Sequence, residues 1–182
     1  MAYFYCDFRD SSKQNRRDLL TSLVIQLSTR SAYCDIPSSL YLKHDSGAKI
    51  PGEDELTKCL GEMVALPDQP PVFIIIDALD ECPDSSGLRT PRERVLSLLK
   101  DLAGLSLPNL HLCVTSRPEF DIRTALEPLA SQRVSLNDQS GQKKDIVDYV
   151  TFFVDSDRRM RRWRDEDKDL VIKTLSNRAD GM

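Results

Sequence analysis

Short stretches made only of apolar residues alternate along this chain with longer stretches in which apolar residues return every three or four positions. The clearest apolar stretch is VFIII at 72–76, and a run without polar positions is typical of a central parallel strand covered by helices on both faces. Shorter patterns of the same kind predict strands at 3–8, 110–115 and 133–136. Because helical stretches separate the strands, the pattern predicts an α/β fold with a parallel sheet.

The helical stretches carry an apolar stripe along one face. The first stripe, at 19–27, predicts a helix of about four turns with Ser11 or Ser12 as its N-cap. A second helix is predicted over 53–65. Later helices are predicted at 120–126, 141–154 and 165–177.

Capping and helix-breaking residues mark where elements begin and end. The sequence TPRE predicts a helix start, because Thr90 can be the N-cap, Pro91 the first helical residue and Glu93 the partner that completes a capping box. The connection 31–54 contains two prolines and two glycines, and we predict that it is irregular, with a short turn around 40–43.

Composition and charge narrow the class of protein. The chain has 182 residues, 40% of them hydrophobic and 30% charged, which is ordinary for a single globular domain. A net charge of -4 and a pI near 5.3 give no electrostatic signature of a nucleic-acid or membrane-surface partner, so we expect neither. No apolar run approaches the roughly 18 residues of a membrane span, and the expected compartment is the cytoplasm. The five cysteines are scattered without a CxxC pair, which predicts reduced thiols.

Polar side chains follow two of the predicted strands. Three acids come after 72–76, and two hydroxyls and an arginine come after 110–115: Asp77, Asp80, Glu81, Thr115, Ser116 and Arg117. Ligands of open parallel sheets lie beyond the carboxyl ends of the strands, so these side chains are expected at one edge. A magnesium nucleotide needs a carboxylate for the hydrated metal, a carboxylate for an attacking water and a cation for the γ-phosphate. The spacing therefore offers candidates for a Mg-nucleotide site.

These residues also carry a resemblance to a known family. VFIIIDALDE at 72–81 and LHLCVTSRP at 110–118 resemble the Walker B and sensor 1 segments of NACHT domains, of the nephrocystin-3-like N-terminal type found in fungal NLR-like proteins. Three further stretches extend the resemblance over nearly the whole chain: YFYCDFRD, SLNDQSGQKKDIVDYV and LSNRADGM. The resemblance implies the three-layer α/β fold of P-loop NTPases of the ASCE and STAND classes, followed by a helical C-terminal part. It also implies a signal-transducing ATPase in which ATP or ADP sets an open or closed state.

The resemblance assigns roles to the candidate residues. Asp80 and Glu81 correspond to the acidic pair near the γ-phosphate and the attacking water, and Arg117 corresponds to the sensor arginine. In the same family the implied partners are other NACHT protomers or C-terminal sensor repeats of a full-length protein.

The resemblance also implies a cofactor, Mg-ATP or Mg-ADP. Asp77 corresponds to the Walker B acid that holds magnesium through water. From their place directly after 110–115, Thr115 and Ser116 are further candidates for nucleotide contacts.

The sequence departs from the family at the phosphate loop. None of the seven glycines opens a GxxxxGK[ST] pattern, since SGAKIPG at 46–52 lacks the first glycine and the hydroxyl residue after Lys49. That loop supplies much of the grip on the phosphates, so we expect no tight ATP binding and no competent ATPase activity in isolation. The chain is then either a fragment that starts after the loop or a degenerate module. By the resemblance, the strand at 110–115 also lacks one neighbour in the sheet.

Two classes of function remain open at this point. The first is a partial NACHT module of a regulatory ATPase, with an α/β core at 1–137 and a helical continuation at 138–182. The second is a nucleotide-independent interaction module, or a truncated product, in which the acids and the arginine pair with each other. The acidic pI disfavours a motor that acts on nucleic acid.

Two further features have simpler interpretations. DRRMRRWRDEDKD at 157–169 places five arginines around Trp163. A nucleic-acid-binding arm is not expected here, since no second aromatic residue is available for base stacking. We expect instead a solvated surface on which these arginines pair with nearby acids. Cys82 follows the acidic turn, and its thiol pKa is not expected to be lowered.

Overall fold

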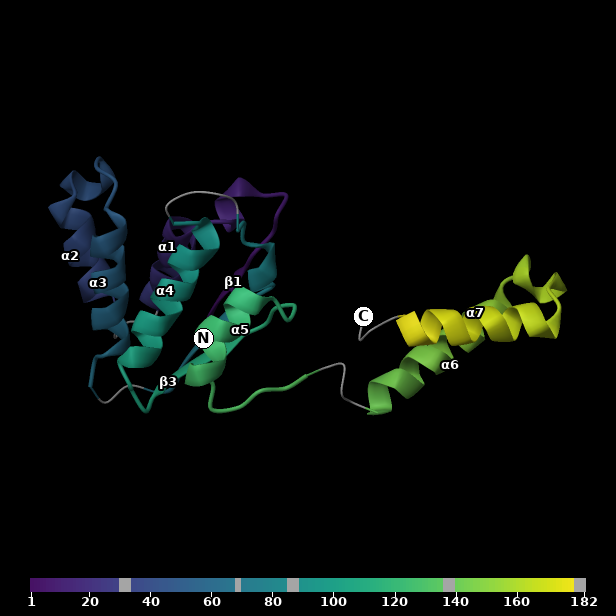
Figure 1. Cartoon of the computed structure of the whole chain (residues 1–182). Coiled ribbons are helices and arrows are strands. Elements are labelled where there is room, and N and C mark those ends of the chain that lie inside the picture. Colours follow the sequence, from purple (N-terminus) through teal and green to yellow (C-terminus); the bar gives the residue numbers. More distant parts are fainter. Residues whose placement is uncertain (30–33, 68–69, 85–88, 136–139, 179–182) are drawn as a thin grey trace. The chain divides into compact units, whose positions relative to one another are not determined.

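The fold is α/β, as predicted. The computed structural model describes residues 1–29, 34–67, 70–84, 89–135 and 140–178. Within these residues it has a sheet of three parallel strands and seven α-helices (Figure 1). The chain forms two compact units, Met1–Ala130 and Ser131–Met182. The boundary predicted at 137/138 stays a prediction.

The three strands lie in the order β1 (Ala2–Tyr5), β2 (Val72–Asp77) and β3 (Leu110–Val114). Each predicted strand in the first unit is confirmed, although β1 ends at Tyr5 instead of residue 8 because the chain turns after Cys6. Among the described residues β3 pairs only with β2, so it is an edge strand, as the resemblance implied.

Within the unit Met1–Ala130, helices cover only one face of the sheet well. Phe4, Ile74 and Ile76 point toward the helices and are buried, with exposed fractions of 8%, 0% and 0%. On the other face Tyr3 and Phe73 are 45% and 48% exposed. Within this unit, the prediction that helices cover both faces of 72–76 is therefore wrong. An all-apolar strand does not reveal this, because both of its faces carry the same kind of side chain.

The covered face shares one hydrophobic cluster with three helices, α1 (Arg16–Ser28), α3 (Glu53–Val64) and α4 (Pro91–Gly104). α1 contacts β1 and both of the other helices (Figure 1). Its predicted apolar stripe is buried, and it meets buried leucines and a methionine of α3 and α4 in one hydrophobic cluster. The largest fully buried side chains of these helices are Leu19, Leu20, Leu23, Leu27, Leu60, Met63, Leu98 and Leu99.

Side-chain caps define the helix starts. Thr90 and Glu93 form the predicted capping box on α4: the Thr90 Oγ1 accepts from the Glu93 N–H at 3.1 Å, and Glu93 Oε2 accepts from the Thr90 N–H at 3.0 Å. The predicted cap of α1 is wrong. Ser11 and Ser12 belong to a short 3-10 turn, and Asn15 caps the helix instead through its Oδ1 atom, which accepts an N–H of the first turn at 2.9 Å. Asn is as strong an N-cap residue as Ser.

The connection predicted to be irregular contains a helix. α2 (Asp35–Lys43) is nine residues long and packs beside α3, with Ile36 and Leu40 partly buried against the core. The sequence argument took Pro37 as a helix breaker. It lies in the first turn of α2, where a proline costs no intrahelical hydrogen bond.

One carboxylate ties α2 to the start of α3. Glu55 Oε1 lies 2.7 Å from Lys43 Nζ, and Glu55 Oε2 accepts from the Gly52 N–H at 3.1 Å. His44 Nε2 lies 3.0 Å from the same Oε2 atom. The Lys43 hydrogen bond, followed by the Gly52 hydrogen bond, lowers the pKa of Glu55 to about 2.

We expect Glu55→Gln to destabilise the protein at pH 7 but not at low pH. The folded-state pKa of Glu55 lies below its usual value of 4.5, so its carboxylate contributes stability above that pH and loses the contribution as pH falls toward 2. The difference in urea midpoint between the wild-type chain and the variant should therefore shrink between pH 6 and pH 3. Glu62→Gln, on the exposed side of the same helix, is the matched control and should show no such trend. A difference that is independent of pH would contradict the assignment.

The remaining helices are close to prediction. α5 (Phe120–Leu126) follows β3 in the first unit, and α6 (Ser140–Ser156) packs against α7 (Asp165–Arg178) in the second. No helix in the described ranges is long and apolar enough to cross a membrane.

The strand predicted at 133–136 is not formed. Residues 133–135 have no strand conformation and Val134 is 71% exposed, while residue 136 lies outside the described residues. A strand this short needs a neighbouring strand to satisfy its backbone. The resemblance placed a further strand between this segment and 110–115.

Candidate functional site

Two turns meet at the carboxyl edge of the sheet. β2 ends at Asp77 and continues into the 3-10 turn η4 (Leu79–Glu81), and β3 ends one residue before Thr115. Because the two strands are parallel neighbours, their following turns lie side by side. The structure therefore brings together the acidic and the basic segment, as the sequence predicted.

Thr115 connects the two turns. Its Oγ1 donates to Asp77 Oδ1 at 2.5 Å and accepts from the Ala78 N–H at 3.0 Å. Ala78 has left-handed backbone angles, φ 53° and ψ 47°, so the chain turns sharply directly after Asp77. The Leu79 N–H then donates to the Thr115 carbonyl at 3.0 Å. These bonds fix the direction of the Asp77 carboxylate.

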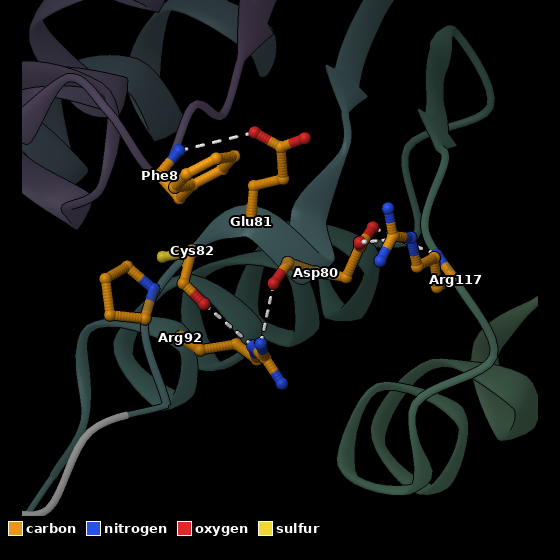
Figure 2. Close-up of a pocket in the computed structure, with 7 residues that line it drawn as sticks. Phe8, Asp80, Glu81, Cys82, Arg92 and Arg117 are labelled. Carbon is orange, nitrogen blue, oxygen red and sulfur yellow. Dashed lines mark hydrogen bonds and ion pairs between the residues drawn. The ribbon is translucent and has the colours of Figure 1, made fainter.

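Asp80 and Arg117 form the second connection. Asp80 Oδ1 accepts from the Arg117 backbone N–H at 2.9 Å, and Asp80 Oδ2 lies 3.5 Å from Arg117 Nε (Figure 2). The Asp80 side chain is 10% exposed, whereas the Arg117 side chain is 73% exposed. An ion pair with one partner in solvent is weak, so the guanidinium can still reach an anion. The neighbouring Ser116 is exposed, and its Oγ donates to the Arg117 carbonyl at 2.8 Å.

Glu81 connects the acidic turn to the loop after β1. Its Oε2 accepts from the Phe8 N–H at 3.3 Å, and Phe8 is 65% exposed (Figure 2). The sequence argument did not include Phe8 in the site. Its position after the first strand was the available signal, since that strand ends at the same edge of the sheet.

Arg92 is a site residue that the sequence argument missed. It lies at the second position of α4 and is only 9% exposed. Its Nε donates to the Cys82 carbonyl at 2.9 Å and its Nη2 to the Asp80 carbonyl at 2.7 Å (Figure 2). Its Nη1 lies 3.4 Å from Asp121 Oδ2. A cation in the first turn of a helix opposes the helix dipole, and this was the signal that could have identified Arg92.

A pocket of about 350 Å³ lies at these turns and carries both signs of charge. Its lining includes Phe8, Asp80, Glu81, Cys82, Arg92 and Arg117. Asp77 and Thr115 are not among the lining residues. The pocket is near the lower limit for small-molecule sites, so it can admit a small polar group.

Comparison with known protein families shows which family this chain belongs to. Residues 1–117 match the family described as nephrocystin 3, N-terminal. The chain belongs to this family. The matched region contains the three strands of the described residues and ends at Arg117. It therefore includes the six predicted site residues and Arg92, while Asp121 lies beyond it. No curated protein and no solved structure matches the chain.

Membership of the nephrocystin 3 N-terminal family identifies a NACHT-associated module, and this confirms the family that the resemblance named. The functional roles implied for Asp77, Asp80, Glu81, Thr115, Ser116 and Arg117 stay predictions.

No disulfide joins the cysteines of this nephrocystin 3 N-terminal domain. Cys82 is 1% exposed, and its Sγ donates to the Gln14 carbonyl at 3.0 Å. Burial raises the pKa of Cys82 to about 11, with Arg92 opposing the shift, so the expectation that it is not lowered is confirmed. Burial also raises the pKa of Cys6 to about 12, helped by Cys82 and Glu81. For Cys82 the cause of the raised pKa is burial, whereas the sequence argument relied on its acidic neighbours.

No group of three or more His, Cys, Asp or Glu side chains in the described ranges could hold a metal ion directly.

The arginine-rich segment differs from expectation. Arg164 pairs with Asp167 at 3.0 Å, but within the described residues Arg158, Arg161 and Arg162 form no ion pair. Asp157 Oδ1 instead accepts the backbone N–H of Arg159 at 2.7 Å. The segment is solvated, as predicted, but most of the predicted pairs are not formed. Of the acids near it, Asp157 accepts backbone N–H groups and Asp165 lies 4.0 Å from Lys168.

Proposed function

We propose that this chain forms the metal and γ-phosphate side of a Mg-nucleotide site in a signal-transducing ATPase module of the NACHT type, with a P-loop NTPase-like core. The observation that carries the proposal is the meeting of two turns at one sheet edge, where Asp80 Oδ1 accepts from the Arg117 N–H at 2.9 Å and Thr115 holds Asp77. Acids and an arginine at this position are what a metal-bound polyphosphate requires.

The residues present fit such a ligand on this side. Asp77 is oriented by Thr115 and can hold a hydrated magnesium ion, whose charge would neutralise the phosphates. The exposed Arg117 guanidinium can bind a phosphate oxygen. Asp80 and Glu81 lie beside it at the pocket, where a carboxylate can orient a water. The sequence has no GxxxxGK[ST] loop, so we propose that this chain alone binds nucleotide weakly and does not hydrolyse it efficiently.

A second candidate is a nucleotide-independent interaction module. One observation favours it: each acid of the site already has a protein partner, Thr115 for Asp77, Arg117 for Asp80 and the Phe8 N–H for Glu81. In either case we propose that the partners are other NACHT protomers or sensor repeats of a longer protein, in the cytoplasm.

Calorimetry with Mg-ATP and Mg-ADP separates the two candidates. We expect no binding tighter than about millimolar for this chain, and at least tenfold tighter binding for a version extended upstream through any encoded phosphate loop. In the extended version Asp77→Asn and Arg117→Ala should each weaken binding by about tenfold or more, which is about 1.4 kcal/mol. Arg123→Ala is a matched control, because Arg123 is also exposed and pairs with an acid, Glu127. Absence of binding in both versions would support the interaction module instead.

A further inference from the structure

We infer that Arg92 is the positioning residue of the acidic turn, and that its guanidinium holds Asp80 and Glu81 in the orientation that the site uses. The use of that orientation rests on the proposed function. The positioning itself is a property of the folded chain and can be measured without nucleotide.

The contacts of Arg92 point to the turn and not to its own helix. Its Nε and Nη2 atoms donate to the carbonyls of Cys82 and Asp80, at 2.9 and 2.7 Å. These two carbonyls lie on either side of Glu81 in the sequence. A planar guanidinium with donors in fixed directions can bind both at once, and this fixes the peptide groups that carry both acids (Figure 2).

The environment of Arg92 is unfavourable for a cation unless specific contacts compensate for it. Its side chain is 11% exposed, and burial of a cation is costly unless it is paired and hydrogen-bonded. It also lies at the second position of α4, where the positive end of the helix dipole repels it. The capping box of Thr90 and Glu93 already satisfies the helix start. The contacts with the turn and with Asp121 at 3.4 Å are therefore what offset these costs.

Two backbone amides report the position of the two acids. The Arg117 N–H donates to Asp80 Oδ1 at 2.9 Å, and the Phe8 N–H donates to Glu81 Oε2 at 3.3 Å. The two amides belong to the loop after β1 and the turn after β3. The Arg92 side chain donates to Cys82, Asp80 and Asp121, and to no residue of these two segments. A hydrogen bond to a carboxylate moves an amide proton downfield, because the acceptor is charged. Loss of either bond is therefore visible in a ¹H–¹⁵N spectrum.

The experiment compares ¹H–¹⁵N spectra of the full chain and its variants. Asp80→Ala and Glu81→Ala define the shifts of the Arg117 and Phe8 amides when each bond is lost. In Arg92→Met we expect both amides to move at least half of the way to those shifts. Arg92→Lys, which keeps the charge but not the planar fork, should move them less. Arg94→Met is the matched control, because Arg94 lies on the same helix, is 52% exposed and contacts Glu53 instead.

Unchanged Arg117 and Phe8 amides in a folded Arg92→Met chain would overturn the inference, since a residue needed only for stability leaves both acids in place. If Arg92→Met does not fold, Arg92→Lys decides by the same two resonances: movement of both supports the inference and movement of neither overturns it. The calorimetry described above is a separate readout. Absence of nucleotide binding would refute the proposed function and leave the amide result standing.

Discussion

Ile74→Ala is expected to lower the free energy of unfolding by about 3 kcal/mol. Ile74 lies in the middle of β2, the central strand, and its side chain is 0% exposed. It belongs to the cluster that joins the sheet to α1, α3 and α4. Shortening it to alanine removes buried apolar surface and leaves a cavity between closely packed layers. Urea denaturation followed by circular dichroism measures the loss.

Ile75→Ala is the matched control for this prediction. It is the same substitution one position further along the same strand, but the side chain points to the less covered face and is only partly buried. We expect a loss of about 1 kcal/mol, in proportion to the smaller area removed from water. Equal losses at the two positions would contradict a sheet that is well covered on one face only.

Arg92→Met is expected to lower the free energy of unfolding by about 3 kcal/mol, since each buried carbonyl that loses its donor costs about 1–3 kcal/mol. The affected carbonyls are those of Asp80 and Cys82. Methionine keeps a flexible apolar side chain of similar length, so the loss reports mainly the hydrogen bonds. The partly exposed Asp121 can be hydrated when its partner is removed, which limits the cost at that end.

Urea denaturation of Arg92→Met, Arg92→Lys and Arg94→Met measures this effect. Lysine keeps the charge and can bind one of the two carbonyls, so an intermediate loss is expected. Arg94 is half exposed, and removal of its contact with Glu53 should cost less than about 0.5 kcal/mol. A loss below about 1 kcal/mol for Arg92→Met would show that water replaces the missing donors, and that the turn does not depend on the guanidinium.

The order of the strands along the chain, and the polar residues that follow β2 and β3, could be predicted because both are properties of local sequence patterns. Apolar runs end where acids, hydroxyls and Arg117 begin, and parallel strands place their carboxyl ends together. The contacts within the site could not be predicted in the same way. That Asp80 and not Asp77 pairs with Arg117 depends on the left-handed turn at Ala78, which rotates the chain between the two acids.

The errors in the predicted fold have similar physical causes. The sequence pattern predicted that Pro37 interrupts a helix, although a proline in the first helical turn loses no hydrogen bond. It predicted a strand at 133–136 from four residues, although a strand exists only with a partner. The apolar pattern predicted that both faces of 72–76 are buried, although the burial of each face depends on which helices pack against it.

The sequence by itself determined the α/β class, the family, the helices with clear apolar stripes and caps, and the residues that follow β2 and β3. These properties depend on side chains that are close together along the chain. Only the tertiary structure decided which sheet face is covered, which acid meets Arg117 and what Arg92 does. Each of these depends on a contact between segments far apart in sequence, such as Arg117 with Asp80, and local patterns do not specify which residues form it.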